Sequence, residues 1–146
     1  MASTQIADDY RGHGWTVSVT ADGIELITDA RIAAVELTGV QAATVRRYLR
    51  ANNLSGPVIE IQGRERREIH LVVGAGKALR AIEMLRESGA TVYTDGARVA
   101  LPAGDPAMGW GIAPGEARWV PPLVAISAAV TAANRSNRSN LRKLAC

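Results

Sequence analysis

The sequence predicts an α+β fold, a single domain with a mainly antiparallel or mixed sheet, two central helices and short helices at both ends. The chain has 146 residues, of which 47% are hydrophobic and 21% charged, and this composition suits one globular domain with a core. Short runs of alternating apolar and polar residues flank the turn dipeptides Asp22-Gly23 and Asp95-Gly96. Two strand–helix–strand passages lie between these turns, and they indicate helices packed on a sheet.

The N-terminal third predicts a helix followed by a hairpin. Residues 1–13 place Ile6 and Tyr10 four positions apart, as on one face of a helix. Residues 15–20 then alternate between apolar and polar side chains, and residues 24–28 form the returning strand.

A third strand over residues 32–37 leads into a helix over residues 38–53. Thr38 and Gln41 fit a capping box at the start of this helix, because each side chain can satisfy a free backbone amide. The predicted core stripe of the helix consists of Ala42, Val45 and Leu49.

The remaining elements alternate between strands and helices. In order they are a strand over 58–62, a charged loop over 63–67, a strand over 68–73, a helix over 74–88, and two strands over 91–94 and 98–101 that pair across Asp95-Gly96. Residues 102–122 are rich in Gly and Pro and contain one short strand over 118–120. A final helix runs from Pro122 to about Ala133.

The spacing of apolar residues predicts one shared core. Its expected members are Val17, Val35, Leu37, Ile59, Ile61, Leu71, Ile82, Leu85 and Val92.

Charge and cysteine content exclude several classes of protein. The formal net charge is +3, but residues 134–146 hold four basic residues and no acid, and the rest of the chain has 13 basic and 14 acidic residues. We therefore divide the chain into a domain over 1–133 and a basic, disordered tail over 134–146.

The only cysteine is Cys146, which excludes a disulfide framework or a cysteine zinc site within one chain. No signal peptide or membrane helix is evident, so we expect a cytoplasmic protein without a membrane partner.

The segment Gly74-Ala75-Gly76-Lys77 resembles part of a phosphate-binding loop. The nucleotide motif needs a further Gly where Leu71 stands and a Ser or Thr where Ala78 stands. A simple glycine-rich entry into a helix is therefore favoured, and no cofactor is predicted.

His70 is the one histidine with acidic residues nearby in the predicted sheet. It lies on the same strand face as Glu68, and Glu36 or Glu60 can lie on neighbouring strands. Such a group can hold a divalent metal or move a proton. The simpler interpretation, a histidine on a partly exposed sheet face, is preferred, so no metal site and no catalytic residue are predicted. If the protein is an enzyme, Glu36 and His70 are the candidates.

Basic residues form three clusters. They are Arg46, Arg47 and Arg50 on one helix face, Arg64, Arg66 and Arg67 in one loop, and Arg135, Arg138, Arg142 and Lys143 in the tail. These clusters can grip the phosphates of DNA or RNA. The alternative is a solvated helix face beside a loop that Glu65 and Glu68 already balance. The chain has no Phe, so recognition by base stacking is not supported.

Five short segments resemble a known family. They are Tyr10-Arg11-Gly12-His13-Gly14-Trp15-Thr16-Val17, Ala34-Val35-Glu36-Leu37-Thr38-Gly39, Glu68-Ile69-His70-Leu71-Val72-Val73, Arg98-Val99-Ala100-Leu101-Pro102 and Ala117-Arg118-Trp119-Val120-Pro121-Pro122. In content and order they resemble the N-terminal primase-polymerase domain of bifunctional DNA primase/polymerases of actinobacteria, their plasmids and phages.

The resemblance implies a relative without catalysis. Active members of the family carry an Asp-x-Asp pair that binds two metals, whereas Glu36 is the only carboxylate on the matching strand here. The family's Ser-x-His segment falls on residues 68–70, where the Ser is absent. We therefore expect a domain that binds nucleic acid or a partner protein in a replication, plasmid, phage or regulatory setting. The alternative is a protein-interaction or homo-oligomer-forming domain with no nucleic-acid role.

Overall fold

The computed structural model describes the backbone of residues 2–145 and the side chains of residues 3–135. Its helices and strands form the α+β fold that the sequence predicts. In chain order they are α1 (Ala2–Arg11), β1 (Thr16–Thr20), β2 (Gly23–Ile27), β3 (Ala33–Thr38), α2 (Gly39–Ala51), β4 (Val58–Ile61), β5 (Arg67–Val72), the 3₁₀ helix η1 (Ala75–Lys77), α3 (Leu79–Glu87), β6 (Thr91–Tyr93), β7 (Arg98–Leu101), β8 (Met108–Ile112) and α4 (Leu123–Ala145).

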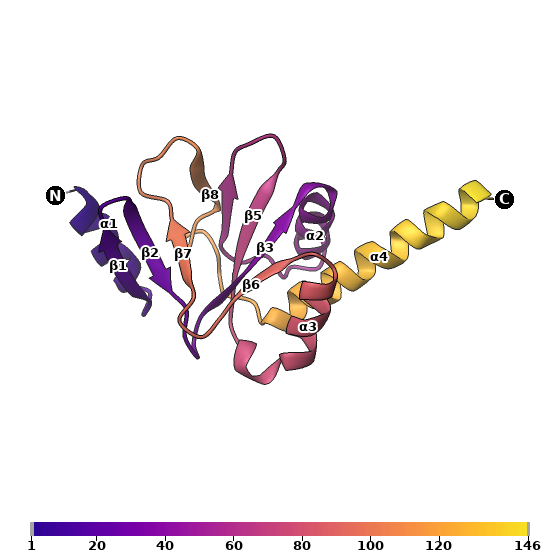
Figure 1. Cartoon of the computed structure of the whole chain (residues 1–146), viewed down its shortest axis with the longest axis horizontal. Coiled ribbons are helices and arrows are strands. Elements are labelled where there is room, and N and C mark those ends of the chain that lie inside the picture. Colours follow the sequence, from indigo (N-terminus) through magenta and orange to yellow (C-terminus); the bar gives the residue numbers. More distant parts are fainter. Residues whose placement is uncertain (1, 146) are drawn as a thin grey trace.

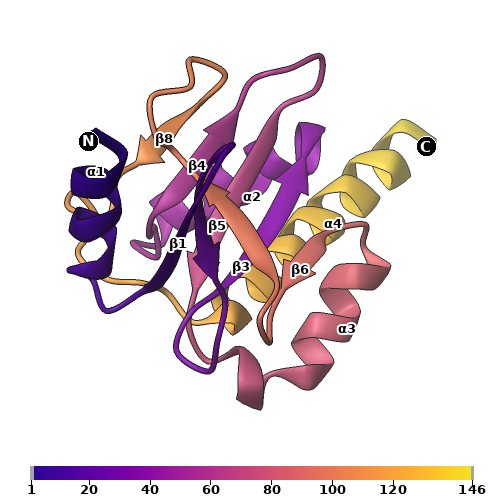
Figure 2. The same cartoon turned by 60° about the vertical axis from the view of Figure 1, so that its left-hand side comes forward.

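Two antiparallel sheets form the framework (Figure 1). The larger sheet has the strand order β6-β3-β5-β4-β8, and the smaller one has the order β1-β2-β7. Helices α2, α3 and α4 cover one face of the larger sheet, whereas the smaller sheet and α1 lie on its other side (Figure 2). The larger sheet is therefore the middle layer, and each of its faces is buried by a different partner.

This layering divides the apolar residues between two cores, so the prediction of one shared core is wrong. Val35, Leu37, Ile82, Leu85 and Val92 lie in the core on the helix side. Val17, Ile59 and Leu71 lie in the core between the sheets, and Ile61 packs at its edge, partly buried. The physical reason is that side chains alternate along a strand, and both faces of this sheet are covered.

Helix α2 begins without the predicted capping box. The Thr38 side chain makes no capping hydrogen bond, and the Gln41 side-chain amide instead donates to the Ser88 carbonyl oxygen at 3.4 Å. The Gly39 backbone amide donates to the Arg66 carbonyl oxygen at 2.8 Å, so the loop between β4 and β5 satisfies a donor at the start of this helix. The predicted core stripe of α2 is confirmed, because Ala42, Val45 and Leu49 are buried.

Strands β6 and β7 flank the predicted turn but do not pair with each other. β6 pairs with β3 in the larger sheet, and β7 pairs with β2 in the smaller one. Asp95 and Gly96 both have positive φ, as a tight turn requires. The buried Thr28 holds the turn, because its backbone amide and hydroxyl both donate to the Ala97 carbonyl oxygen. These hydrogen bonds fix the turn at the point where the chain passes from β6 in the larger sheet to β7 in the smaller one.

The Gly- and Pro-rich segment contains one strand, but not where the sequence predicts it. Residues 118–120 are not a strand, whereas β8 lies at the edge of the larger sheet and pairs with β4. β8 shows no alternation of apolar and polar side chains, because two of its five residues are glycines. At one of them, Gly111, an added Cβ would lie 2.5 Å from the Glu60 Oε1 atom, so the Glu60 side chain would have to move.

Helix α4 is longer than the predicted terminal helix. It runs to Ala145 rather than Ala133, and its second half extends beyond the sheets (Figure 1). The backbone therefore differs from the predicted disordered tail, and residues 134–145 contain no Gly or Pro that would end a helix. Within the residues that the structure describes, no helix is both long and apolar enough to cross a bilayer.

Candidate functional site

A buried carboxylate organises the face of the larger sheet beneath α2. Glu68 on β5 has no exposed surface, and it points to the helix side because it pairs with Leu37 in register. Its Oε1 atom accepts hydrogen bonds from Arg46 Nη1 on α2 at 2.7 Å and from Arg66 Nε at 2.9 Å. Arg46 Nη1 also donates to Glu60 Oε1 on β4 at 2.8 Å. One carboxylate thus joins a helix, a strand and a loop.

Glu68 is ionised in this setting. Burial alone acts to raise the pKa of Glu68, because it removes water from the charged form. The contacts with His70, Arg66 and Arg46 act in the opposite direction and prevail, so they hold the pKa at about 2 instead of 4.5. The carboxylate therefore neutralises positive charge of the two arginines that it binds.

His70 lies next to Glu68 and is also buried, with 1% of its surface exposed. The predicted partly exposed position is therefore wrong, because α2 and α4 cover this face of the sheet. His70 Nε2 lies 3.5 Å from Glu68 Oε2, and neither of these atoms nor His70 Nδ1 has a hydrogen-bond partner in the described part of the chain.

Glu36 lies on the opposite face of the same sheet. Its carboxylate accepts hydrogen bonds from Arg67 Nε at 3.0 Å, from Arg67 Nη2 at 3.2 Å and from the Tyr93 hydroxyl at 2.9 Å. Glu36 and His70 therefore do not converge, whereas Glu60 and Glu68 share the face of His70. Among the side chains of residues 3–135, no group of three His, Cys, Asp or Glu residues is placed to hold a metal ion.

The predicted arginines of α2 and one arginine of the loop line a single depression beside this network. We name it the arginine hollow, and it is lined by Arg46, Arg47, Arg50, Arg66, Ala43 and Glu60. Arg46 and Arg66 bind Glu68. Arg47 and Arg50 are exposed and form no ion pair with any side chain that the structure describes. The hollow therefore combines two anchored guanidinium groups with two that face solvent.

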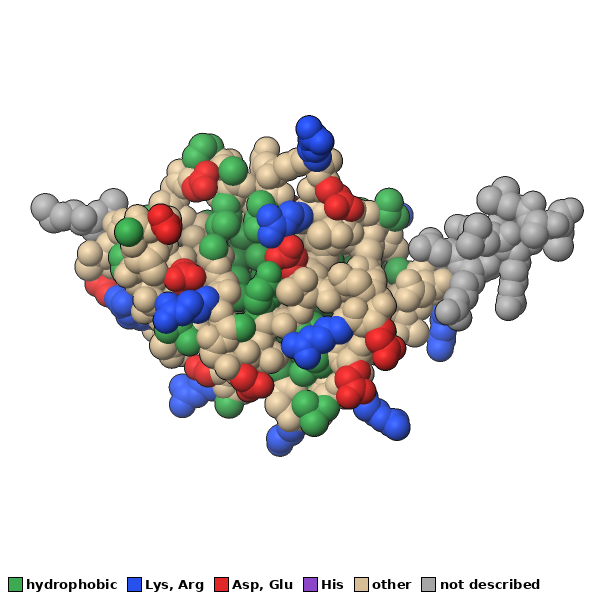
Figure 3. Space-filling model, viewed as in Figure 1, with side chains coloured by type: hydrophobic (Ala, Val, Ile, Leu, Met, Phe, Trp, Pro, Cys, Tyr) green, Lys and Arg blue, Asp and Glu red, His purple; other side chains and the backbone are tan. Residues whose placement is uncertain are grey.

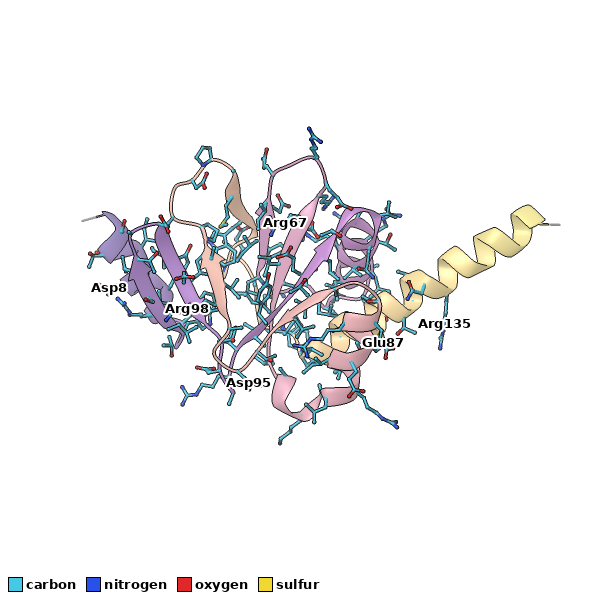
Figure 4. The ribbon with its side chains drawn as sticks, viewed as in Figure 1. Asp8, Arg67, Glu87, Asp95, Arg98 and Arg135 are labelled. Carbon is cyan, nitrogen blue, oxygen red and sulfur yellow. The ribbon has the colours of Figure 1, made fainter. Side chains whose placement is uncertain are left out.

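The other predicted basic residues lie elsewhere or beyond description. Arg64 is exposed in the loop between β4 and β5. Arg67 lies over the opposite sheet face, where Glu36 binds it, and Figure 4 shows it far from Arg135 on α4. Arg135 is exposed. The side chains of Arg138, Arg142 and Lys143 fall outside the described residues.

Sequence patterns identify the arginines of the hollow but not the carboxylate that anchors two of them. The pairing of Arg46 with Glu68 depends on β5 lying beneath α2, between β3 and β4. The available signal is Glu68 itself, an acidic residue directly before the apolar residues Ile69, Leu71 and Val72 of the same strand. Comparisons with family models, curated proteins and solved structures find no match to this chain.

Proposed function

We propose that this chain binds the phosphate backbone of DNA or RNA through the arginine hollow. The observation that carries the proposal is the pair Arg47 and Arg50. These two exposed guanidinium groups form no ion pair with a described side chain, and they lie beside two guanidinium groups that Glu68 binds. Guanidinium groups bind phosphate oxygens in a bidentate manner, and a preformed group loses less freedom when it binds. Arg64 on the adjoining loop adds a further exposed cation.

The chemistry of the hollow favours contacts to the backbone rather than to bases. No aromatic side chain lines the hollow, so bases have no stacking platform there. Contacts to phosphate carry no sequence information by themselves. The proposed binding is therefore tolerant of sequence. The basic residues of α4 from Arg135 onwards are proposed to extend the same binding surface.

The proposal includes no catalysis. Two-metal nucleotidyl transfer needs acidic ligands that converge on one spot. Glu36 lies across the sheet from Glu68 and His70, which supports a primase-polymerase-like domain that binds without reacting. A replication, plasmid, phage or regulatory setting is part of the same proposal and derives from the family resemblance.

Replacing Arg47 and Arg50 together by alanine is expected to weaken nucleic-acid binding about ten-fold or more at low salt, because two phosphate contacts disappear. Fluorescence anisotropy with a labelled single strand and a labelled duplex measures this change. The matched control is Arg31→Ala with Arg98→Ala, which removes the same charge elsewhere on the body. If the control variant loses as much affinity, the effect depends on net charge alone, and this result would contradict a defined binding site.

A further inference from the structure

A second surface, separate from the arginine hollow, exposes apolar side chains where η1, α3 and α4 meet. Leu79 is the first residue of α3 and is 70% exposed, and Val124 near the start of α4 is 51% exposed. Both line one hollow, together with Gly76, Lys77, Ala78, Arg80 and Ala81. Figure 3 shows green, blue and red side chains close together at the lower edge of the molecule. We name this surface the α3/α4 hollow.

The fold itself does not need these apolar side chains. The buried face of α3 consists of Ile82 and Leu85, and α4 begins with the fully buried Leu123. Leu79 and Val124 point away from those cores, where polar residues would serve the helices equally well. Single exposed apolar residues are ordinary, but two that share one hollow form a contact surface.

The charged side chains that line the α3/α4 hollow are both basic. Lys77 at the end of η1 and Arg80 on α3 are exposed, and neither forms an ion pair with a described side chain. No acidic residue lines the hollow, and neither α3 nor α4 has an acidic residue in its first turn. Glu83 lies further along α3, outside the lining. The surface therefore offers an apolar floor with two cations at its rim.

We propose that the α3/α4 hollow docks a short acidic segment of a partner protein that carries an apolar side chain. The apolar side chain packs between Leu79 and Val124, and neighbouring carboxylates bind Lys77 and Arg80. Burial of an apolar side chain supplies affinity, and complementary charge selects acidic segments and speeds the encounter.

Three other occupants fit the hollow less well. In a two-fold dimer through this surface, Lys77 and Arg80 of each copy would face a patch whose lining offers no acidic residue to pair with them. A bilayer needs more than two apolar side chains and two cations for stable attachment, since each cation contributes only about 1 kcal/mol. Nucleic acid gains little from the apolar floor, which offers no aromatic ring for stacking.

The two surfaces lie at opposite ends of one strand. β5 starts beside Arg66 of the arginine hollow, and the chain that leaves its other end enters η1 (Figure 1). A peptide in the α3/α4 hollow and a nucleic acid in the arginine hollow can therefore be bound at the same time. The docking proposal does not depend on the proposed function.

The test is a selection of random short peptides displayed on phage against the immobilised full chain, followed by anisotropy with the enriched peptides. We expect enrichment of peptides with Asp or Glu around a Leu, Ile, Phe or Trp. We expect Leu79→Ser and Val124→Ser each to weaken their binding about ten-fold, as at a central contact residue. Lys77→Glu should weaken it and make the remaining binding less sensitive to salt. The control Val19→Ser changes an exposed valine on β1 and should leave binding unchanged.

Several outcomes would overturn the docking proposal. Selection without acidic–apolar enrichment is one, and enriched peptides that bind Leu79→Ser as well as the natural chain are another. Sedimentation velocity that detects a dimer abolished by Leu79→Ser would assign the surface to a second copy. Co-sedimentation with phosphatidylglycerol vesicles that Val124→Ser abolishes, without peptide binding, would assign it to a membrane surface.

Discussion

Glu68→Gln is expected to lower the free energy of unfolding at neutral pH by about 3 kcal/mol, the free energy equivalent of holding the pKa of Glu68 at about 2 instead of 4.5. Glutamine keeps the shape of the side chain but removes the charge that binds Arg46 and Arg66. Urea unfolding of both proteins at pH 7 measures the difference. The control Glu65→Gln changes an exposed carboxylate of the adjoining loop, and it should change stability by less than about 0.5 kcal/mol.

The destabilisation caused by Glu68→Gln is expected to depend on pH, with a definite sign. The pKa of Glu68 is lower in the folded protein, so its contribution is complete above pH 4.5 and is lost as the pH falls towards 2. The difference in stability between the natural chain and Glu68→Gln should therefore shrink from pH 5 downwards. A difference that stays constant between pH 5 and pH 2 would show that shape, and not charge, accounts for the effect.

Leu85→Ala is expected to cost about 2–5 kcal/mol of stability, through lost burial and the cavity that remains. Leu85 is fully buried in the core between α3, α4 and the larger sheet. Leu79→Ala on the same helix is the matched control, because Leu79 is mostly exposed and its loss should cost less than about 0.5 kcal/mol. Similar midpoints of urea unfolding for the two variants would contradict the assignment of α3's buried face.

Local patterns predict most elements of this fold but not all of their partners. The alternation of apolar residues locates the strands, and the stripe of Ala42, Val45 and Leu49 orients α2 correctly. Alternation does not reveal which strands pair. The Asp95-Gly96 turn resembles a hairpin turn locally, but long-range hydrogen bonds from Thr28 separate its two strands. Edge strand β8 escapes notice because its two glycines leave few side chains to form a pattern.

In the candidate site, too, local patterns predict some features, whereas long-range contacts determine the others. Arg46, Arg47 and Arg50 can be assigned to one helix face from their spacing alone, and the structure places them around one hollow. The loop arginines cannot be assigned in this way. The sequence places them together in one loop, whereas the structure directs Arg66 and Arg67 to different faces of the larger sheet. Arg66 binds Glu68 on the helix side, whereas Arg67 binds Glu36 on the other side. The burial of Glu68 and His70 depends on helices that lie far from them in sequence.

The salt dependence of nucleic-acid binding by the full chain tests the central claim most directly. Each phosphate contact releases counterions, so the logarithm of affinity falls with the logarithm of salt concentration by about 0.7 to 0.9 per contact. For the natural chain we predict tight binding at low salt and a slope that corresponds to several phosphate contacts. For the chain with Arg47→Ala and Arg50→Ala we predict a slope smaller by about two contacts. Absence of binding to any single or double strand at low salt, or an unchanged slope in the double variant, would contradict phosphate recognition by the arginine hollow.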